Sequence, residues 1–230
     1  MVRQFIPDVD TVRERFAEVQ GRIAEAARTA GRDPEAVSVL VATKYVAAEH
    51  LSALRDAGIR LIGENRAQDL VAKHGLYGDA FDWHFIGHLQ SRKTRLVLPL
   101  VSLIHSVSSL SVVQEIEARA ANTTDVLLEV NIGGEESKSG VPLGEVDAFL
   151  EAVSGHHKVR FTGLMCMPPL SDQAEEARPY FVRARELAQR LSTMWSGTYT
   201  FDQLSMGTSA DYEVAVQEGA TIVRVGSVLF

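Results

Sequence analysis

One lysine lies in an otherwise apolar run near the start of the chain. The stretch VLVATKYV, residues 39–46, is rich in β-branched residues and carries Lys44. Because side chains alternate along a strand, Leu40, Ala42 and Lys44 share one face. The other face holds bulkier residues that suit packing beneath helices, so we expect Lys44 to face the mouth of a barrel.

Desolvation at the mouth of the barrel would favour a neutral amine on Lys44, which attacks carbonyl carbons. The alternative is a lysine that extends into water at a strand end.

Hydroxyl residues surround a glycine in a second stretch, LSMGTSADYE, residues 204–213. The pattern is typical of a strand that enters a helix through Gly207, and Thr208 or Ser209 can cap that helix. The free N–H groups of a first helical turn favour an anion. This stretch, which also contains Ser205, therefore predicts half of a phosphate-binding cup, with a simple helix cap as the alternative.

A third stretch combines an arginine with a flexible backbone. TIVRVGSVLF, residues 221–230, is typical of a final strand with Arg224 and Gly226 on one face. Glycine lets a ligand approach the backbone, and barrels often bind phosphate with the loops after their seventh and eighth strands. An arginine inside a barrel needs an acceptor, because an unpaired buried guanidinium is expensive. Without a ligand, a salt bridge to Glu64 or Glu129 would supply that acceptor.

The composition argues against several classes of partner. The chain has 230 residues and a formal net charge of −7, without a run of Lys and Arg that could follow a phosphate backbone. Its single cysteine, Cys166, cannot form an internal disulfide. The N-terminus, MVRQFIPDVDTVRERF, has neither a signal-peptide core nor an apolar membrane span. We therefore expect a cytoplasmic protein that binds neither nucleic acid nor membrane.

Short apolar runs and helical segments alternate along the whole chain. Strictly alternating elements imply parallel strands with right-handed crossovers, and eight such units close a parallel sheet. The prediction is a single (β/α)8 TIM barrel over residues 1–230, and the alternative is an open doubly wound sheet. In a barrel the chemistry lies at the carboxyl ends of the strands. We expect strands near residues 37–43, 60–64, 83–87, 103–107, 126–132, 160–165, 201–205 and 221–225.

An extra amphipathic helix is predicted before the first strand, over residues 11–30. Thr11 and Glu14 fit a capping box at its start, and Gly31 fits a stop at its end. The helices expected between the strands include residues 47–57, 110–121, 143–153, 175–191 and 211–218.

Together, an amine on the first strand, an anion cup on the last two and an arginine between them suit an aldehyde cofactor that carries a phosphate. Eight stretches, in family order and spacing, also resemble the pyridoxal-phosphate homeostasis protein family. They are VATKYV, IGENRAQD, WHFIGHLQSRK, HSVSS, EVNIGGEESKSG, TGLMCMPP, LSMGTSADYEVAV and VRVGSVLF. The resemblance covers almost the whole chain.

The resemblance implies a barrel like the N-terminal domain of alanine racemase, with pyridoxal 5'-phosphate as cofactor and Lys44 as its Schiff-base lysine. It implies that Arg224 faces the pyridine nitrogen. The remaining residues that it places at the cofactor are the phosphate-side residues Ser205, Gly207, Thr208, Gly226 and Ser227, and the ring-side residues Asn65, His84 and Met165. The family is understood to bind, buffer and deliver the cofactor, so apo enzymes that depend on it are the implied partners.

Catalytic turnover is not expected from this set of residues. Arginine cannot donate a proton to the pyridine nitrogen, and this weakens the ring as an electron sink. Racemisation also needs a second base, which the similar racemases take from a partner subunit's added domain. Tyr45 adjoins Lys44 but is expected on the opposite strand face, and Tyr212 is expected on the helix after the cup. Both are more simply explained as packing residues. Without that added domain we expect a monomer. The alternatives are a low-activity amino-acid racemase and, less well supported, a class I aldolase.

Two departures from the family pattern stand out. Gly133 replaces a residue that is usually serine or similar, and this is expected to alter the loop after the fifth strand. The chain stops at Phe230 where relatives continue, so the closing end of the eighth strand is expected to be incomplete.

Other chemical features of the sequence are explained more simply. His84 and His88 would be about 13 Å apart on a strand, too far to share a metal ion. The polar loop GGEESKSG, which includes Glu135, Glu136 and Lys138, is expected to be a solvated turn that could also cover the site. Cys166 is expected in the core, and Met165 and Met167 are expected to line the barrel.

Overall fold

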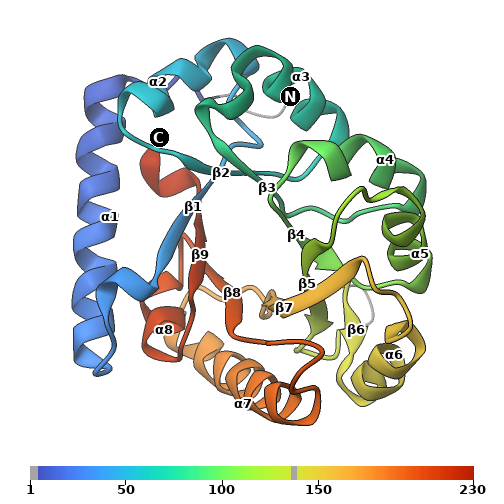
Figure 1. Ribbon diagram of the computed structural model, residues 1–230. Coiled ribbons are helices and arrows are strands. Elements are labelled where there is room, and N and C mark those ends of the chain that lie inside the picture. The colour runs from blue at the N-terminus through green and yellow to red at the C-terminus, as the bar shows by residue number, and fades with distance from the viewer. Residues whose placement is uncertain (1–4, 136–138) are drawn as a thin grey trace.

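The computed structural model describes residues 5–135 and 139–230, which form a ring of parallel strands surrounded by helices (Figure 1). The strand order is β4-β3-β2-β1-β9-β8-β7-β5, and pairing between β4 and β5 closes the ring. The predicted eight-stranded barrel is therefore confirmed, and the open sheet is wrong. The strands of the ring are β1 (Ser38–Ala42), β2 (Leu61–Glu64), β3 (Asp82–Phe85), β4 (Leu103–Val107), β5 (Thr124–Asn131), β7 (Val159–Cys166), β8 (Gln203–Thr208) and β9 (Ile222–Val225).

A short ninth strand was not expected from the sequence. β6 (Val141–Pro142) pairs only with the end of β5 and lies outside the ring. The eighth strand of the ring, β9, pairs with β1 on one side and β8 on the other. The ring is thus continuous at the point where the anion cup was predicted.

Helices cover the outside of the ring and match most of the predicted ones. The region 47–57 begins with a 3-10 turn, Ala48–His50, so its α-helix is shorter than expected. Helices α3 and α4 add to those named from the sequence. The α-helices are α1 (Val9–Thr29), α2 (Leu51–Asp56), α3 (Ala67–Tyr77), α4 (Thr94–Val97), α5 (Leu110–Arg119), α6 (Val146–Val153), α7 (Arg178–Met194) and α8 (Tyr212–Gln217).

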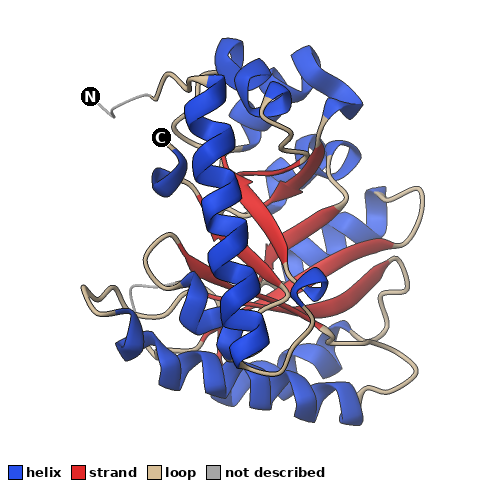
Figure 2. Ribbon diagram, turned by 90° about the vertical axis from the view of Figure 1, so that its left-hand side faces the viewer, coloured by secondary structure: helices blue, strands red, loops and turns tan. Residues whose placement is uncertain are grey.

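The extra helix α1 starts earlier than predicted and lies along one side of the barrel (Figure 2). Its N-cap is Asp8, whose carboxylate accepts a hydrogen bond of 2.9 Å from the N–H of Thr11. The predicted capping box is therefore wrong, because Asp8 already supplies the acceptor. Gly31, at φ +67°, follows the helix as expected. Apolar residues such as Val19 and Ile23 are buried where α1 packs against α2 and α8.

Two apolar clusters divide the interior. The larger cluster lies between the strands and the helices and includes Val41. The smaller one fills the inside of the ring and contains Leu40, Leu103, Leu127, Met165 and Ile222. Leu40 and Val41 therefore face opposite sides of β1, as the alternation predicted.

Among the described residues, no helix has the length and apolar character needed to cross a membrane.

Candidate functional site

A cavity of about 480 Å³ opens where the carboxyl ends of the strands meet, and we call it the mouth cavity. Side chains from opposite sides of the ring line it, together with the loops that follow β8 and β9. It contains the predicted site residues Lys44, Asn65, Met165, Thr208, Arg224, Gly226 and Ser227.

Lys44 lies in a turn just beyond β1, and its side chain is exposed in the mouth cavity. Its Nζ lies 4.8 Å from the centre of the Tyr45 ring. The expected desolvation is absent, because the lysine extends toward water as the alternative proposed. Tyr45 was expected on the opposite face but also lines the cavity, since strand alternation ends at Ala42. The amine is therefore accessible to an entering ligand.

A buried ion pair fixes the backbone from which Lys44 projects. Lys73 and Glu64, which are 4% and 0% exposed, form a salt bridge. The Lys73 Nζ also donates a hydrogen bond of 2.8 Å to the carbonyl of Thr43, and the Thr43 hydroxyl donates to Glu64. The carbonyl and the hydroxyl of Thr43 are thus both held by charged side chains. These bonds fix the backbone from which the next residue, Lys44, projects. Lys73 was not predicted from the sequence, although Leu70 and Lys73 are three apart on the buried face of α3.

Arg224 is buried, and neutral acceptors hold its guanidinium in place. One terminal nitrogen donates to the carbonyl and the hydroxyl of Ser205, the former at 2.7 Å. The other donates to the carbonyl of Cys166 at 3.0 Å and contacts the sulfur of Met167 at 2.9 Å. Among the described residues no carboxylate pairs with it, so the expected salt bridge to glutamate is wrong. Burial lowers the pKa of Arg224.

The loops after β8 and β9 meet at one edge of the mouth cavity. The N–H of Gly226 donates a hydrogen bond of 3.1 Å to the hydroxyl of Ser209, which joins the two loops. Thr208 donates from its N–H and its hydroxyl to Asp211, at 2.6 and 3.0 Å. Neither Thr208 nor Ser209 therefore caps α8, contrary to the sequence analysis. The exposed Ser227 completes this hydroxyl-rich edge.

Gly207 supports the cup without lining the cavity. Its φ is +89°, and a Cβ there would lie 2.5 Å from the Cβ of Ala215 in α8. Only glycine fits both the backbone conformation and this close approach. Gly226, which does line the cavity, is less tightly enclosed, because a Cβ there would be 3.3 Å from the carbonyl of Ala42.

His84 and Ser205 lie inside the barrel beneath the mouth cavity and do not line it. Ser205 is fully buried and contacts the cavity residue Arg224. His84 faces a cavity of about 370 Å³ at the amino ends of the strands. After β3, the residues that line the mouth cavity are Ile86 and Gly87. His84 lies two residues before Ile86, so it is too deep in the barrel to reach the cavity.

Two buried polar atoms in the mouth cavity lack a partner among the described residues. They are the Oδ1 of Asn65 and the Oε2 of Glu129. Burial raises the pKa of Glu129 to about 7, against a smaller opposing effect of Arg224. Because buried polar atoms are nearly always hydrogen-bonded, these atoms indicate a place for a polar ligand. From the sequence, Glu129 was predicted only as a possible salt-bridge partner of Arg224.

The remaining residues singled out from the sequence lie in different surroundings. Cys166 is buried as expected, and burial raises the pKa of its thiol to about 12. Tyr212 is buried on α8, where Arg22 lies over its ring. A Cβ on Gly133 would be 3.3 Å from the ring of Pro169. Glu136 and Lys138 lie outside the described residues.

Aromatic rings from distant parts of the sequence border the mouth cavity. Phe5 stacks on Phe230 with ring centres 5.2 Å apart, and its N–H donates to the carbonyl of Tyr45 at 2.9 Å. All three residues line the cavity. The segment that carries Lys44 is therefore attached to both ends of the described chain.

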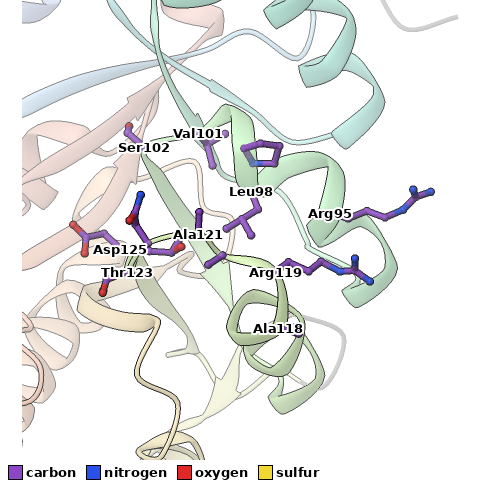
Figure 3. Close-up of a pocket in the computed structure, with 13 residues that line it drawn as sticks. Arg95, Leu98, Val101, Ser102, Ala118, Arg119, Ala121, Thr123 and Asp125 are labelled. Atoms are coloured by element: carbon purple, nitrogen blue, oxygen red, sulfur yellow. The ribbon is translucent and has the colours of Figure 1, made fainter.

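A larger cavity, of about 740 Å³, lies at the amino ends of β4 and β5 (Figure 3). In Figure 3 the exposed Arg95 and Arg119 extend in the same direction, away from Asp125. Arg119 pairs with Glu115, and Asp125 pairs with Arg160. No predicted site residue lines this cavity. Its size exceeds that of the mouth cavity, but its chemistry is that of an ordinary surface.

Comparison with known proteins identifies the family of this chain. The family model described as "Alanine racemase, N-terminal domain" matches residues 15–230. A pyridoxal phosphate homeostasis protein of Aquifex aeolicus is 39% identical over 221 residues, which cover 94% of this chain and 96% of the relative. A solved protein of Bifidobacterium adolescentis has a TM-score of 0.86 at 35% identity, covering 100% of this chain and 99% of that one.

A further solved relative contains a ligand. PipY of Synechococcus elongatus, solved with PLP bound, has a TM-score of 0.82 at 30% identity and covers 95% of this chain and 99% of its own. Both the family match and the full-length relatives agree with the resemblance seen in the sequence. The chain belongs to the alanine racemase N-terminal domain family and, within it, to the pyridoxal phosphate homeostasis proteins.

Proposed function

We propose that this protein binds pyridoxal 5'-phosphate in the mouth cavity and acts in its homeostasis and delivery inside the cell. The observation that carries the proposal is the meeting, in one cavity, of an accessible amine, a buried arginine and a hydroxyl-rich edge. The unpartnered atoms of Asn65 and Glu129 fit a ligand with several polar groups. The PLP-bound relative and the names of the curated relatives support the same ligand.

Each part of the cavity has a separate task in this proposal. Lys44 contributes the amine that condenses with the aldehyde and releases water, giving a Schiff base. Arg224 faces the pyridine nitrogen, while Ser227 and the loops that hold Gly226 and Thr208 face the phosphate. When bound, the cofactor supplies a reactive aldehyde carbon and an electron-accepting ring. The protein holds both without an acid beside the ring nitrogen, because arginine keeps its proton.

A carrier fits this arrangement better than a transaminase-like enzyme does. An unprotonated ring nitrogen is a weak electron sink, and Arg224 is held by three oxygen acceptors that keep it in place. Lys44 remains exposed, so water and other amines reach the linkage and allow exchange. Bound cofactor would therefore be released to other proteins.

A racemase is the second candidate, and one observation favours it. Glu129 places a carboxyl group with a pKa of about 7 in the same cavity as Lys44, and Tyr45 lies there too. Racemisation requires two groups that can give and take a proton on opposite faces of the substrate. Exchange of the α-proton of a panel of amino acids for deuterium separates the candidates, because a carrier shows no exchange above that of free cofactor.

The test of the first proposal is Lys44→Ala, with Lys158→Ala as the matched control. Lys158 lies at the amino end of the barrel, where its Nζ donates to the carbonyl of Ala120. We expect the wild type and the control to be yellow after incubation with cofactor and to gain its mass on borohydride reduction. Lys44→Ala should lose the Schiff-base absorption and the trapped mass. An unchanged spectrum in Lys44→Ala refutes the assignment.

Three accompanying predictions rest on the sequence alone. They are delivery to apo enzymes that depend on the cofactor, a cytoplasmic location and a monomeric state. Transfer is measured by mixing the loaded protein with an apo enzyme and following the recovered activity beside an equal amount of free cofactor. Sedimentation equilibrium measures the oligomeric state.

A further inference from the structure

A line of hydrogen bonds crosses the inside of the barrel beneath the mouth cavity. The Nδ1 of His84 on β3 lies 2.9 Å from the Nε2 of His105 on β4. The Nδ1 of His105 lies 2.8 Å from the hydroxyl of Ser205 on β8. That hydroxyl in turn accepts a hydrogen bond from Arg224 on β9. All four side chains are buried, and together they connect the two ends of the barrel.

The arginine sets the direction of this line at one end. A guanidinium only donates, so the Ser205 oxygen is an acceptor toward Arg224. The single proton of the Ser205 hydroxyl is then available for the Nδ1 of His105. Among the described residues, Arg224 and His105 are the two side chains that contact this hydroxyl. With Nδ1 as acceptor, a neutral His105 carries its proton on Nε2. That proton points to the Nδ1 of His84.

A carboxylate sets the same direction at the other end. The Nε2 of His84 faces a carboxylate oxygen of Asp82 at 3.8 Å, which is longer than a hydrogen bond, and Asp82 accepts a hydrogen bond from Ser102. A carboxylate only accepts, so the nitrogen that faces it is favoured as the N–H. His84 then carries its proton on Nε2 and accepts at Nδ1. The direction deduced from the arginine and the direction deduced from the carboxylate agree.

The electrostatic surroundings keep both imidazoles neutral. Burial lowers the pKa of His84, against a smaller opposing effect of Asp82. Burial also lowers the pKa of His105, and the positive charge of Arg224 adds to this effect. A second proton on either ring would place two donors face to face and break the line.

We propose that His84, His105 and Ser205 are positioning residues that hold Arg224 in one orientation toward the ligand in the mouth cavity. The hydrogen bonds are present in the protein without cofactor. Their effect on cofactor binding rests on the proposed function. Ser205 can accept from Arg224 without a competing demand because His105 takes its proton. Removal of the acceptor on His105 therefore loosens the guanidinium of Arg224. A looser guanidinium in turn weakens its contact with the pyridine ring of the cofactor.

The first test needs no cofactor. The ring nitrogens of the histidines are measured by ¹⁵N NMR in the cofactor-free protein at pH 7, and His84→Gln and His105→Asn assign the signals. We expect both rings to be neutral with the proton on Nε2. A proton on Nδ1 of either ring, or a charged imidazolium, overturns the deduced direction.

The second test compares two substitutions of one residue. His105→Asn keeps an acceptor near the position of Nδ1, whereas His105→Leu has a similar size and none. We expect His105→Leu to weaken cofactor binding about tenfold and to shift the visible absorption maximum, because one hydrogen bond to a charged group is loosened. His105→Asn should stay within about threefold of the wild type. The exposed His157→Leu is the control and should bind as the wild type does.

The outcomes separate this inference from the proposed function. If the wild type binds cofactor and His105→Leu and His105→Asn lose equal affinity, or neither loses any, the positioning role is wrong and the binding function stands. If the wild type binds none, both the function and the role in binding are wrong, while the NMR result still decides the direction of the bonds. Ser205→Ala serves where His105→Leu does not fold, with the same expected loss.

Discussion

The two ends of this barrel differ more in chemistry than in shape. The amino end has the larger cavity, but the ion pairs there are open to solvent, as in Arg160 with Asp125. The carboxyl end has the smaller mouth cavity, with a buried arginine and a buried carboxyl group that lacks an ionic partner among the described residues. Cavity volume alone would therefore select the end opposite the proposed site. Ionisable groups that are buried at a cost in stability support the proposal that the carboxyl end binds the ligand.

The largest difference between the two ends should appear when the buried ion pair is broken. Lys73→Ala leaves Glu64 buried without its counter-charge, and we expect a loss of about 3–5 kcal/mol in the free energy of unfolding. Urea denaturation followed by circular dichroism measures it. The double variant Lys73→Met with Glu64→Leu removes both charges and should recover most of the loss. A small effect of Lys73→Ala would mean that the ion pair contributes little to stability.

The pH dependence of the mouth end should be dominated by Glu129. Its pKa is raised from 4.5 to about 7, so the folded protein binds a proton that the unfolded chain releases between these values. The contribution to stability is complete below pH 4.5 and is lost as the pH rises through about 7, a change of about 3 kcal/mol. Glu129→Gln should abolish this loss. The measurement is urea unfolding from pH 5 to pH 8.

A matched control makes this prediction specific. The exposed Glu151→Gln should leave the pH dependence as it is in the wild type. If Glu129→Gln keeps the full decline in stability, then the carboxyl group is already charged below neutral pH and the unpartnered oxygen is satisfied in another way.

At the amino end the pH dependence should have the opposite sign. The pKa of His84 is lowered by burial from its ordinary value of 6.5, so the unfolded chain binds the proton first as the pH falls. Stability is complete above pH 6.5 and decreases toward acid pH. His84→Gln should reduce the loss of stability toward acid pH, and the exposed His157→Gln should not. Urea unfolding between pH 4 and pH 7 would contradict the assignment if His84→Gln and the wild type lost stability in parallel.

The smallest effect is expected from an exposed pair at the amino end. Arg160→Ala breaks the contact with Asp125, but the side chains are 52% and 32% exposed. Solvent screening limits such a pair to less than about 1 kcal/mol. The same urea titration measures it, and added salt should reduce the difference further. A loss as large as that of Lys73→Ala would remove the contrast between the two ends.

The barrel and the mouth residues could be predicted because their signals are local. β-branched runs alternate with helical segments, and this order alone implies parallel strands around a ring. Lys44, Arg224 and Gly226 lie near the carboxyl ends of strands, where barrel chemistry is found. These inferences need only the period of the pattern and the place of a residue within its strand.

The errors arose where tertiary contacts decide the outcome. Tyr45 was predicted on the wrong face because β1 ends at Ala42. The backbone just after β1 is held by a residue distant in the sequence, Lys73, which donates a hydrogen bond to the carbonyl of Thr43. His84 was placed beside the cofactor because the sequence does not reveal how far β3 is shifted along its neighbours. The acceptors of Arg224 on β7 and β8 could not be predicted, because two of the three are backbone carbonyls.

The stacking of Phe5 on Phe230 has a practical consequence for anyone who modifies this protein. A tag or fusion partner attached at either terminus is tethered close to the opening and would obstruct access to Lys44. A circular permutant avoids this problem. A short linker would join the termini, and the chain would be reopened at the exposed turn around Gly197, between α7 and β8. Its new termini would lie at the opposite end of the barrel, where a label or surface attachment leaves the opening clear.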